Sequence, residues 1–138
     1  MQKMNLANSH DEEMVRRGLA RPEDVRAVEI AALVDTGATM LMLPAEVVAL
    51  LGLPEMGRRE VVHANGQCGE LPWVGGIRIT ILGRDAIASA LVGPAGTTAL
   101  IGQLQLEELD LIVDPKSREL RVNPLSPNMP RLDLKSAA

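Results

Sequence analysis

The sequence has very few aromatic residues and a single cysteine. Its 138 residues include one Trp, no Tyr and no Phe. Single-stranded nucleic acids are bound largely by stacking bases on aromatic side chains, so no such platform is expected. The only cysteine, Cys68, excludes an internal disulfide and a cysteine-based zinc site. A lone cysteine is consistent with a reducing compartment, and we expect a cytoplasmic protein.

Clustered positive charge and long apolar runs are also missing. The net charge is −4, and the 14 Lys and Arg residues form no cluster that could bind phosphates, so no nucleic-acid partner is expected. The first residues, "MQKMNLANSHDEE", lack the apolar core of a secretion signal. No apolar run approaches the length of a membrane span, so no membrane partner is expected.

The sequence does contain short apolar segments separated by turn residues. Alternation and β-branched residues predict strands over residues 25–34, 60–62, 77–82 and 86–92. Two further short strands are expected on either side of a turn at Asp114-Pro115. Asn65-Gly66, inside "EVVHANGQCGELP", predicts a hairpin. Two short helices are expected, over residues 44–51 and 104–109. The pattern favours a mostly β fold, either a barrel or a folded-over sheet.

We expect one domain over residues 1–138. Its core is predicted over residues 25–123, between an N-terminal extension, 1–24, and a Pro-rich tail, 124–138. The extension is polar near its end and could hold one helical turn. A weak internal repeat is also visible: "AALVDTGA" and "TTALIGQ" are each an apolar strand that ends in a Gly turn before a short helix. This repetition suggests a pseudo-twofold within the chain.

One stretch, "AALVDTGATMLMLP" (31–44), combines a buried strand with chemistry. The strand ends at Asp35, which places a carboxylate at the rim of the core. Gly37 permits a tight turn and a close approach of the backbone to a ligand. The Thr36 hydroxyl can bind a neighbouring backbone group and stiffen the loop. A rigid, partly desolvated carboxylate suits general acid–base catalysis, and amide hydrolysis needs two of them sharing one proton.

These residues are part of a wider resemblance. The segment "LVDTGATMLMLP", a hairpin with a Gly turn, "ILGRDAIASALVGP" and "ALIG" before a short helix resemble the retropepsin-type aspartic proteases, in the order and spacing of that family. Small single-domain bacterial members are the most similar, and the resemblance covers about residues 28–114. It implies a retropepsin-like acid protease half-barrel with two short helices that dimerises across its active site. It also implies an aspartyl protease, a hydrolase that cleaves peptide bonds without a cofactor or a metal ion.

The resemblance also assigns roles to residues of the DTG motif. Asp35 matches the catalytic aspartate, and Thr36 matches the residue that locks the two active-site loops together across the homodimer. Gly37 lies beside the bound substrate in that family, and Ala38 lines the cleft.

Two other segments match the family. The second loop, beneath the active site, corresponds to Ile101 and Gly102. The flap, a mobile lid over the cleft, corresponds to the hairpin tip at His63, Ala64, Asn65 and Gly66. An apolar cleft lining would favour hydrophobic side chains around the cleaved bond; the candidates are Ala38, Val62, Val92 and Ile101.

This chain departs from the retroviral pattern at two positions. Retroviral members carry an Asp directly after DTGA and an Arg directly after the second Gly, and this chain has Thr39 and Gln103 there. The retroviral bracing of the dimer is therefore not expected here. The hairpin tip "HANGQ" is also more polar than retroviral flaps.

The second carboxylate is expected from another copy of the chain. Asp85, Asp110 and Asp114 are the candidates within one chain, but none is followed by Thr or Ser and then Gly. Their surroundings indicate a hairpin turn, a helix exit and a strand-ending turn. A twofold dimer would place Asp35 of each copy on either side of the axis, over a peptide or protein substrate.

Other functions also fit parts of the sequence. The main alternative is a dimeric peptide-binding or assembly module on the same fold with little or no proteolysis. His63 and Cys68, on the two arms of the hairpin, could suggest a cysteine nucleophile, but no oxyanion site accompanies them. The run from His10 to Glu13 could suggest a metal site, although a solvated helix start is the simpler interpretation.

Overall fold

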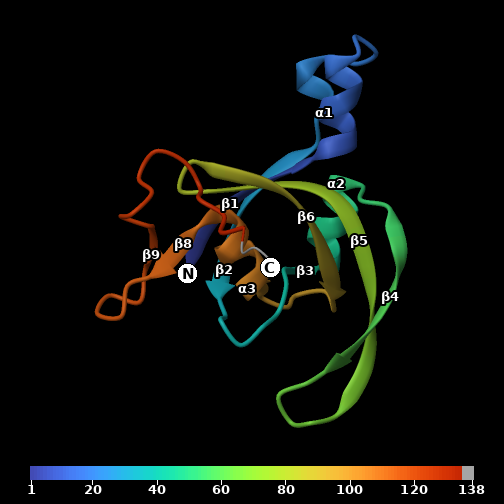
Figure 1. Cartoon of the computed structure of the whole chain (residues 1–138). Helices are drawn as coiled ribbons and strands as arrows, with labels where there is room; N and C mark the ends of the chain where they lie inside the picture. The colour runs from blue at the N-terminus through green and yellow to red at the C-terminus, as the bar shows by residue number, and fades with distance from the viewer. Residues whose placement is uncertain (135–138) are drawn as a thin grey trace.

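The computed structural model describes residues 1–134 and contains nine strands, three α-helices and a short 3-10 helix (Figure 1). The strands are β1 (Gln2–Asn8), β2 (Ala27–Val34), β3 (Met42–Pro44), β4 (Glu55–Val62), β5 (Cys68–Ile81), β6 (Arg84–Gly93), β7 (Ala99–Ile101), β8 (Leu111–Val113) and β9 (Leu120–Val122). The helices are α1 (Ser9–Arg16), η1 (Pro22–Asp24), α2 (Ala45–Leu51) and α3 (Gln103–Leu109). Within residues 1–134, no helix is both long and apolar enough to span a membrane.

Six of the strands close a barrel. The sheet runs in the order β1-β2-β7-β3-β6-β5-β4, and β1 also pairs with β5, which joins the two sides. Strand β4 lies outside this ring and pairs with β5, while β8 and β9 form a separate two-stranded sheet. The predicted mostly β fold is confirmed. The predicted half-barrel is wrong, because the barrel closes within one chain.

The barrel closes through residues that the sequence analysis placed in an N-terminal extension. Strand β1 pairs antiparallel with β2 and with β5, and its Met4 and Leu6 side chains are fully buried in the core. Residues 2–8 therefore belong to the barrel, and the core does not begin near residue 25. Alternating Met4 and Leu6 predict a strand, but their two neighbouring strands lie far away in the sequence.

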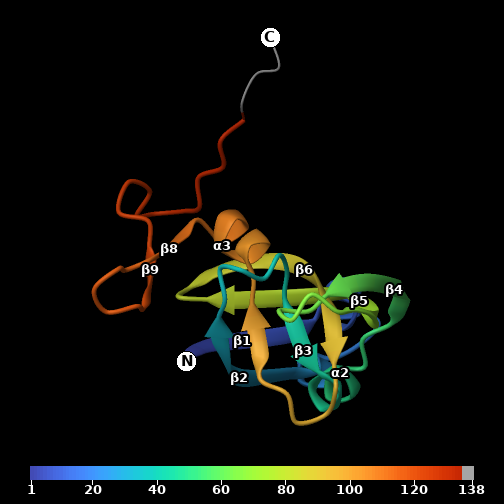
Figure 2. The same ribbon diagram turned by 90° about the horizontal axis from the view of Figure 1, so that it is seen from below.

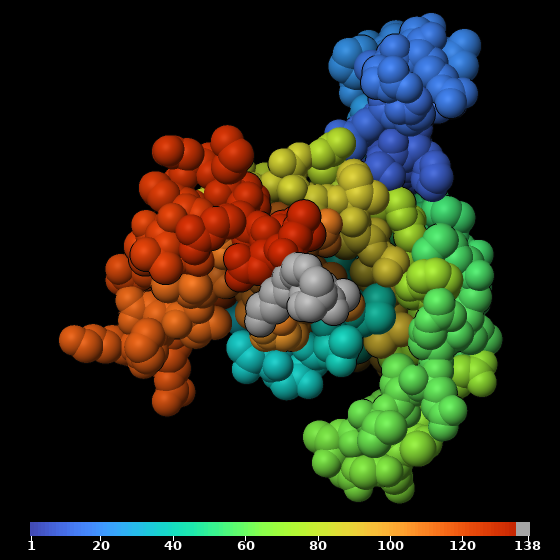
Figure 3. All heavy atoms as spheres, viewed as in Figure 1, coloured from blue at the N-terminus to red at the C-terminus, as the bar shows by residue number. Residues whose placement is uncertain are grey.

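Helix α1 is longer than the single turn predicted for this region. Buried Asn8 accepts hydrogen bonds from the backbone amides of His10 and Asp11, which is a typical helix N-cap. Its side-chain amide donates to the Leu51 carbonyl at 2.8 Å and so ties the start of α1 to the end of α2. Helix α1 buries no residue and projects from the barrel (Figures 1 and 3). With α1, the part of the chain up to residue 134 contains three α-helices where two were expected.

Strand β5 unites two segments that the sequence suggested were separate. It includes the return arm of the predicted hairpin and the predicted strand at residues 77–82. The register of its pairing with β6 shifts between Val74 and Ile77, where Gly76 has a φ of +75°. This bulge changes which positions of β5 face the core, so that Ile77, Ile79 and Ile81 are all buried there.

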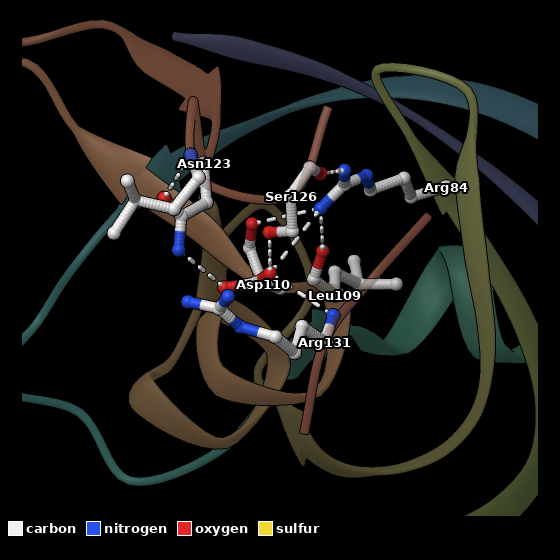
Figure 4. A network of polar contacts seen from close by, with 7 residues as sticks. Arg84, Leu109, Asp110, Asn123, Ser126 and Arg131 are labelled. Atoms are coloured by element: carbon white, nitrogen blue, oxygen red, sulfur yellow. Dashed lines mark hydrogen bonds and ion pairs between the residues drawn. The ribbon is translucent and has the colours of Figure 1, made fainter. Parts of the chain in front are cut away.

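The C-terminal segment is fastened to the barrel by a buried arginine (Figure 4). Arg84, at the start of β6, donates hydrogen bonds to the backbone carbonyls of Leu109, Asp110 and Ser126. The Asp110 carboxylate accepts hydrogen bonds from the side chains of Asn123 and Ser126 and from the backbone amide of Arg131. Two elements distant in sequence, β6 and the tail, are thereby joined around the end of α3.

This cluster predicts a contribution to acid sensitivity. Hydrogen bonds from Ser126, Asn123 and the Arg131 amide lower the pKa of Asp110 to about 2, from an ordinary value of 3.8. The pKa of Asp110 is lower in the folded state than in the unfolded state. Its ionised carboxylate therefore stabilises the fold fully above the unfolded-state pKa, and this stabilisation is lost as the pH falls through about 2. We expect wild type to lose more unfolding free energy than Asp110→Asn between pH 6 and pH 2. Urea unfolding at each pH measures this difference, and equal losses in the two proteins would contradict it.

Candidate active site

Asp35 lies directly after β2, where two parallel strands end side by side. Strand β2 pairs with β7, and Val34 is opposite Ile101. The Asp35 backbone amide donates to the Ile101 carbonyl at 3.0 Å, which continues the ladder by one hydrogen bond. The Asp35 side chain is partly buried at this edge of the barrel. The sequence analysis therefore located this carboxylate correctly, at the end of a core strand.

The carboxylate is held by its own loop. The Gly37 amide donates to Asp35 Oδ1 at 3.0 Å, and the Ala38 amide donates to the Asp35 backbone carbonyl at 3.1 Å. The second oxygen, Oδ2, has no hydrogen-bond partner within residues 1–134. One oxygen is thus fixed in place, while the other is available for a further proton, a water molecule or another carboxyl group.

The second loop packs tightly against the Asp35 loop. A Cβ atom added to Gly102 would lie 2.5 Å from the Met40 nitrogen, so only glycine allows this approach. The backbone amides of Gln103 and Leu104, at the start of α3, donate to the Ala38 and Thr39 carbonyls at 2.8 and 3.0 Å. The structure therefore brings together the two loops that the sequence analysis singled out. The close contact of Gly102 with Met40 was not predicted from the sequence, because it involves backbone atoms of Met40 and does not depend on its side chain.

Thr36 does not stiffen the loop in the way expected from its sequence. Its side chain is exposed, and its hydroxyl makes no hydrogen bond to any residue from 1 to 134. The amides of Gly37 and Ala38 hold the turn instead. The Thr36 hydroxyl remains available to a group from outside the chain.

The predicted flap residues form the tip of a long hairpin. His63, Ala64, Asn65 and Gly66 connect β4 to β5 and are all exposed. The His63 amide donates to the Gln67 carbonyl at 2.8 Å, and the Gly66 amide donates to the His63 carbonyl at 2.9 Å. The tip projects well beyond the barrel (Figure 3), and Arg59 packs on the Trp73 ring at 3.7 Å in the hairpin stem. The Asn65-Gly66 hairpin is confirmed.

The apolar residues expected to line a cleft differ in exposure. Ile101 is 0% exposed and belongs to the core, so it presents no surface to a substrate in the single chain. Val62 is exposed near the hairpin tip, while Ala38 and Val92 are partly buried. Ile101 therefore supports the Asp35 loop from below and is removed from the predicted lining.

The other candidate carboxylates have partners of their own. Asp85 pairs with Arg78, Asp110 belongs to the Arg84 cluster, and Asp114 accepts hydrogen bonds from the amides of Lys116 and Ser117. Those two amides lower the pKa of Asp114. None of the three is hydrogen-bonded to Asp35, which agrees with their interpretation as turn and helix-end residues.

The structure also bears on the two minor alternatives, a metal site at His10 to Glu13 and a cysteine nucleophile in the hairpin. In the run from His10 to Glu13, each acidic side chain pairs with arginine: Asp11 with Arg26, Glu12 with Arg78, and Glu13 with Arg16 and Arg17. No group of His, Cys, Asp and Glu side chains in residues 1–134 has the arrangement of a metal site. In the hairpin, Cys68 is exposed and the His63 ring lies over Gly69.

Comparison with known proteins adds no family. A scan against protein-family models finds no match, and a search of curated proteins finds no significant match.

Proposed function

We propose that this protein is an aspartic endopeptidase that works as a homodimer, with Asp35 from each copy forming the catalytic pair. The observation that carries the proposal is the state of the Asp35 carboxylate. One of its oxygens is fixed by the Gly37 amide, and the other has no partner in the described chain. The hydrogen bond to Oδ1 fixes the position of the carboxylate, and Oδ2 is left to share a proton with a second carboxylate.

The pairing of two copies follows from what one chain lacks. No other carboxylate of residues 1–134 is hydrogen-bonded to Asp35, and the next candidates along the chain have other partners. The Thr36 hydroxyl also has no hydrogen-bond partner in residues 1–134, and Leu33, near the end of β2, is 47% exposed. In a dimer with a twofold axis through this surface, the Asp35 loops of the two copies would face each other. A single sequence would then supply both carboxylates.

The chemistry would then follow from one shared proton. Two carboxyl groups about 3 Å apart do not both ionise, so one is a base and the other an acid. The ionised Asp35 removes a proton from water as the oxygen attacks the peptide carbonyl carbon, and the protonated one donates a hydrogen bond to the carbonyl oxygen. The C–N bond breaks as the leaving nitrogen receives a proton from the pair.

The hairpin supplies the second half of the cleft in this proposal. An extended peptide would lie between the hairpin tip and the Asp35 loop, with its backbone pairing as an added strand. Within residues 1–134, the tip is held by the hydrogen bonds of its own turn alone and is exposed, so it can move with little loss of contact. Its closure would exclude bulk water from the carboxyl pair.

The test is hydrolysis of denatured casein, measured from acid to neutral pH with and without a pepstatin-type inhibitor. We expect inhibitor-sensitive cleavage with a bell-shaped pH dependence, because one carboxyl must be ionised and the other protonated. A protein that dimerises in sedimentation experiments but cleaves nothing at any pH would contradict the proposal. That result would favour the peptide-binding or assembly module.

A further inference from the structure

A large hollow lies on the barrel away from the hairpin, beside α3. It is open to solvent, has a volume of about 910 Å³ and is bordered by α3, by the middle of β6 and by the tail around residue 132. Figure 2 shows α3 between β6 and the segment that follows β9. Its floor and walls include Ile87, Leu104, Gln105, Glu108, Arg131 and Leu132. Asp35 is not among the residues that border it.

Three apolar side chains converge on this hollow from three different elements. Ile87 of β6, Leu104 of α3 and Leu132 of the tail are 49%, 50% and 60% exposed. Single exposed apolar residues are common, but three around one hollow form a surface suited to an apolar side chain of a partner.

A buried polar group in the same wall lacks a partner. Gln105 is only 4% exposed, and its Oε1 atom is buried without any hydrogen-bond donor in residues 1–134. An unpaired buried carbonyl oxygen is costly unless a donor is supplied. Gln105 borders the hollow, so a peptide N–H that enters there is a donor of the kind that its side-chain oxygen lacks. A peptide backbone carries such donors at regular spacing.

The charges around the hollow favour a basic partner. Within residues 1–134, three carboxylates outside the Arg84 cluster border it, those of Glu107, Glu108 and Asp133, against one cation, Arg131. None of the three carboxylates forms an ion pair within the described chain, and the Glu107 carboxylate accepts a hydrogen bond from the Gln103 side-chain amide. A lysine or arginine beside an apolar anchor would therefore complement this rim.

We propose that this hollow is a docking site for a peptide segment of a partner protein that carries an apolar side chain next to Lys or Arg. The apolar side chain lies among Ile87, Leu104 and Leu132, and the basic side chain faces Glu107 and Glu108. This site does not depend on the proposed hydrolysis, because Asp35 is not part of it.

The test uses short fluorescein-labelled peptides containing leucine and lysine, with fluorescence anisotropy as the measurement. The protein carries Asp35→Asn, so that no peptide is cleaved. We expect the Leu/Lys peptides to bind, and peptides with glutamate in place of lysine, or serine in place of leucine, to bind at least roughly tenfold more weakly. Equal binding of all three peptide sets, or no binding of any, would overturn the proposal.

Matched variants locate the binding. Leu104→Ser, in α3, should weaken the Leu/Lys peptides roughly tenfold, because an apolar contact is lost. Leu50→Ser is the control, since Leu50 is 55% exposed on the equally short helix α2 and does not border the hollow. Equal effects of the two variants would overturn the site. A change in sedimentation mass caused by Leu104→Ser would also overturn it, because a second copy would then be the occupant.

Gln105→Met separates binding from a purely structural role. Removing the unpaired amide should raise the melting temperature by about 3 °C, while binding of the Leu/Lys peptides falls severalfold. A variant that gains stability and binds as well as the parent protein would show that Gln105 faces no ligand, and would contradict the proposed backbone contact.

Discussion

Asp35→Asn should lower peptide hydrolysis by about 10⁴-fold, because asparagine can neither take a proton from water nor hold one for the leaving group. The change should leave folding intact. Asparagine has the same shape, and its side-chain oxygen can still accept the hydrogen bond from the Gly37 amide. Casein hydrolysis and urea unfolding, measured on the same preparations, should therefore show a large loss of rate and little change in stability.

A mixing experiment tests whether the two carboxylates come from two chains. When wild type and Asp35→Asn are mixed in equal amounts and allowed to exchange, only about a quarter of the dimers carry two Asp35 residues. Activity should then fall to about half that of the same amount of wild-type protein assayed without the variant. Unchanged activity after verified exchange would mean that one carboxylate is enough.

A second carboxylate variant provides the control for this experiment. Asp85→Asn removes an exposed carboxylate that pairs with Arg78 at the β5–β6 turn, far along the chain from the Asp35 loop. We expect it to keep its hydrolytic activity. If Asp85→Asn and Asp35→Asn were equally inactive, a catalytic pair made of two copies of Asp35 would be contradicted.

Arg84→Met should lower the free energy of unfolding by about 3 kcal/mol or more. Arg84 is only 6% exposed, and it is the donor to three backbone carbonyls that join α3 and the C-terminal segment. Methionine fills similar space but supplies no donor, so these carbonyls would lose their partner. Urea unfolding measures the loss, and limited proteolysis should show earlier cleavage within residues 111–134.

An exposed arginine provides the comparison. Arg121 is 61% exposed and pairs with Asp114 at 2.9 Å, so Arg121→Met should cost under about 1 kcal/mol. If the two arginine variants were equally stable, the Arg84 cluster would not be what fastens the tail. Arg84→Lys should lie between wild type and Arg84→Met, because a single ammonium cannot reach all three carbonyls in the same geometry.

The parts of the fold that were predicted well depend on local patterns. The Asn65-Gly66 hairpin, helix α2 ending at Gly52 and the strand that leads to Asp35 all follow from turn residues and alternation between neighbours in the sequence. The contact between the Asp35 loop and Gly102 was also anticipated, although from a resemblance and not from spacing.

The parts that were missed depend on distant partners. Strand β1 is held by β2 and β5, and without those strands a seven-residue segment at the start of the chain carries little indication that it closes a barrel. Ile101 was assigned to a cleft because its position in the chain does not reveal which face of β7 it occupies. The role of Arg84 was invisible for the same reason, since its three acceptors lie 25 to 42 residues away.

The sequence by itself determined that the chain is mostly β, where the Asn65-Gly66 hairpin lies, and that Asp35 ends an apolar strand before a glycine turn. These features depend on interactions between residues close in the chain, which can be inferred from the types of neighbouring residues. Only the tertiary structure decided that the barrel closes through β1. It also decided that, among residues 1–134, one oxygen of Asp35 and the side-chain oxygen of Gln105 have no hydrogen-bond partner. Each of these features depends on contacts between residues far apart in the sequence, and those contacts form only when the whole chain packs.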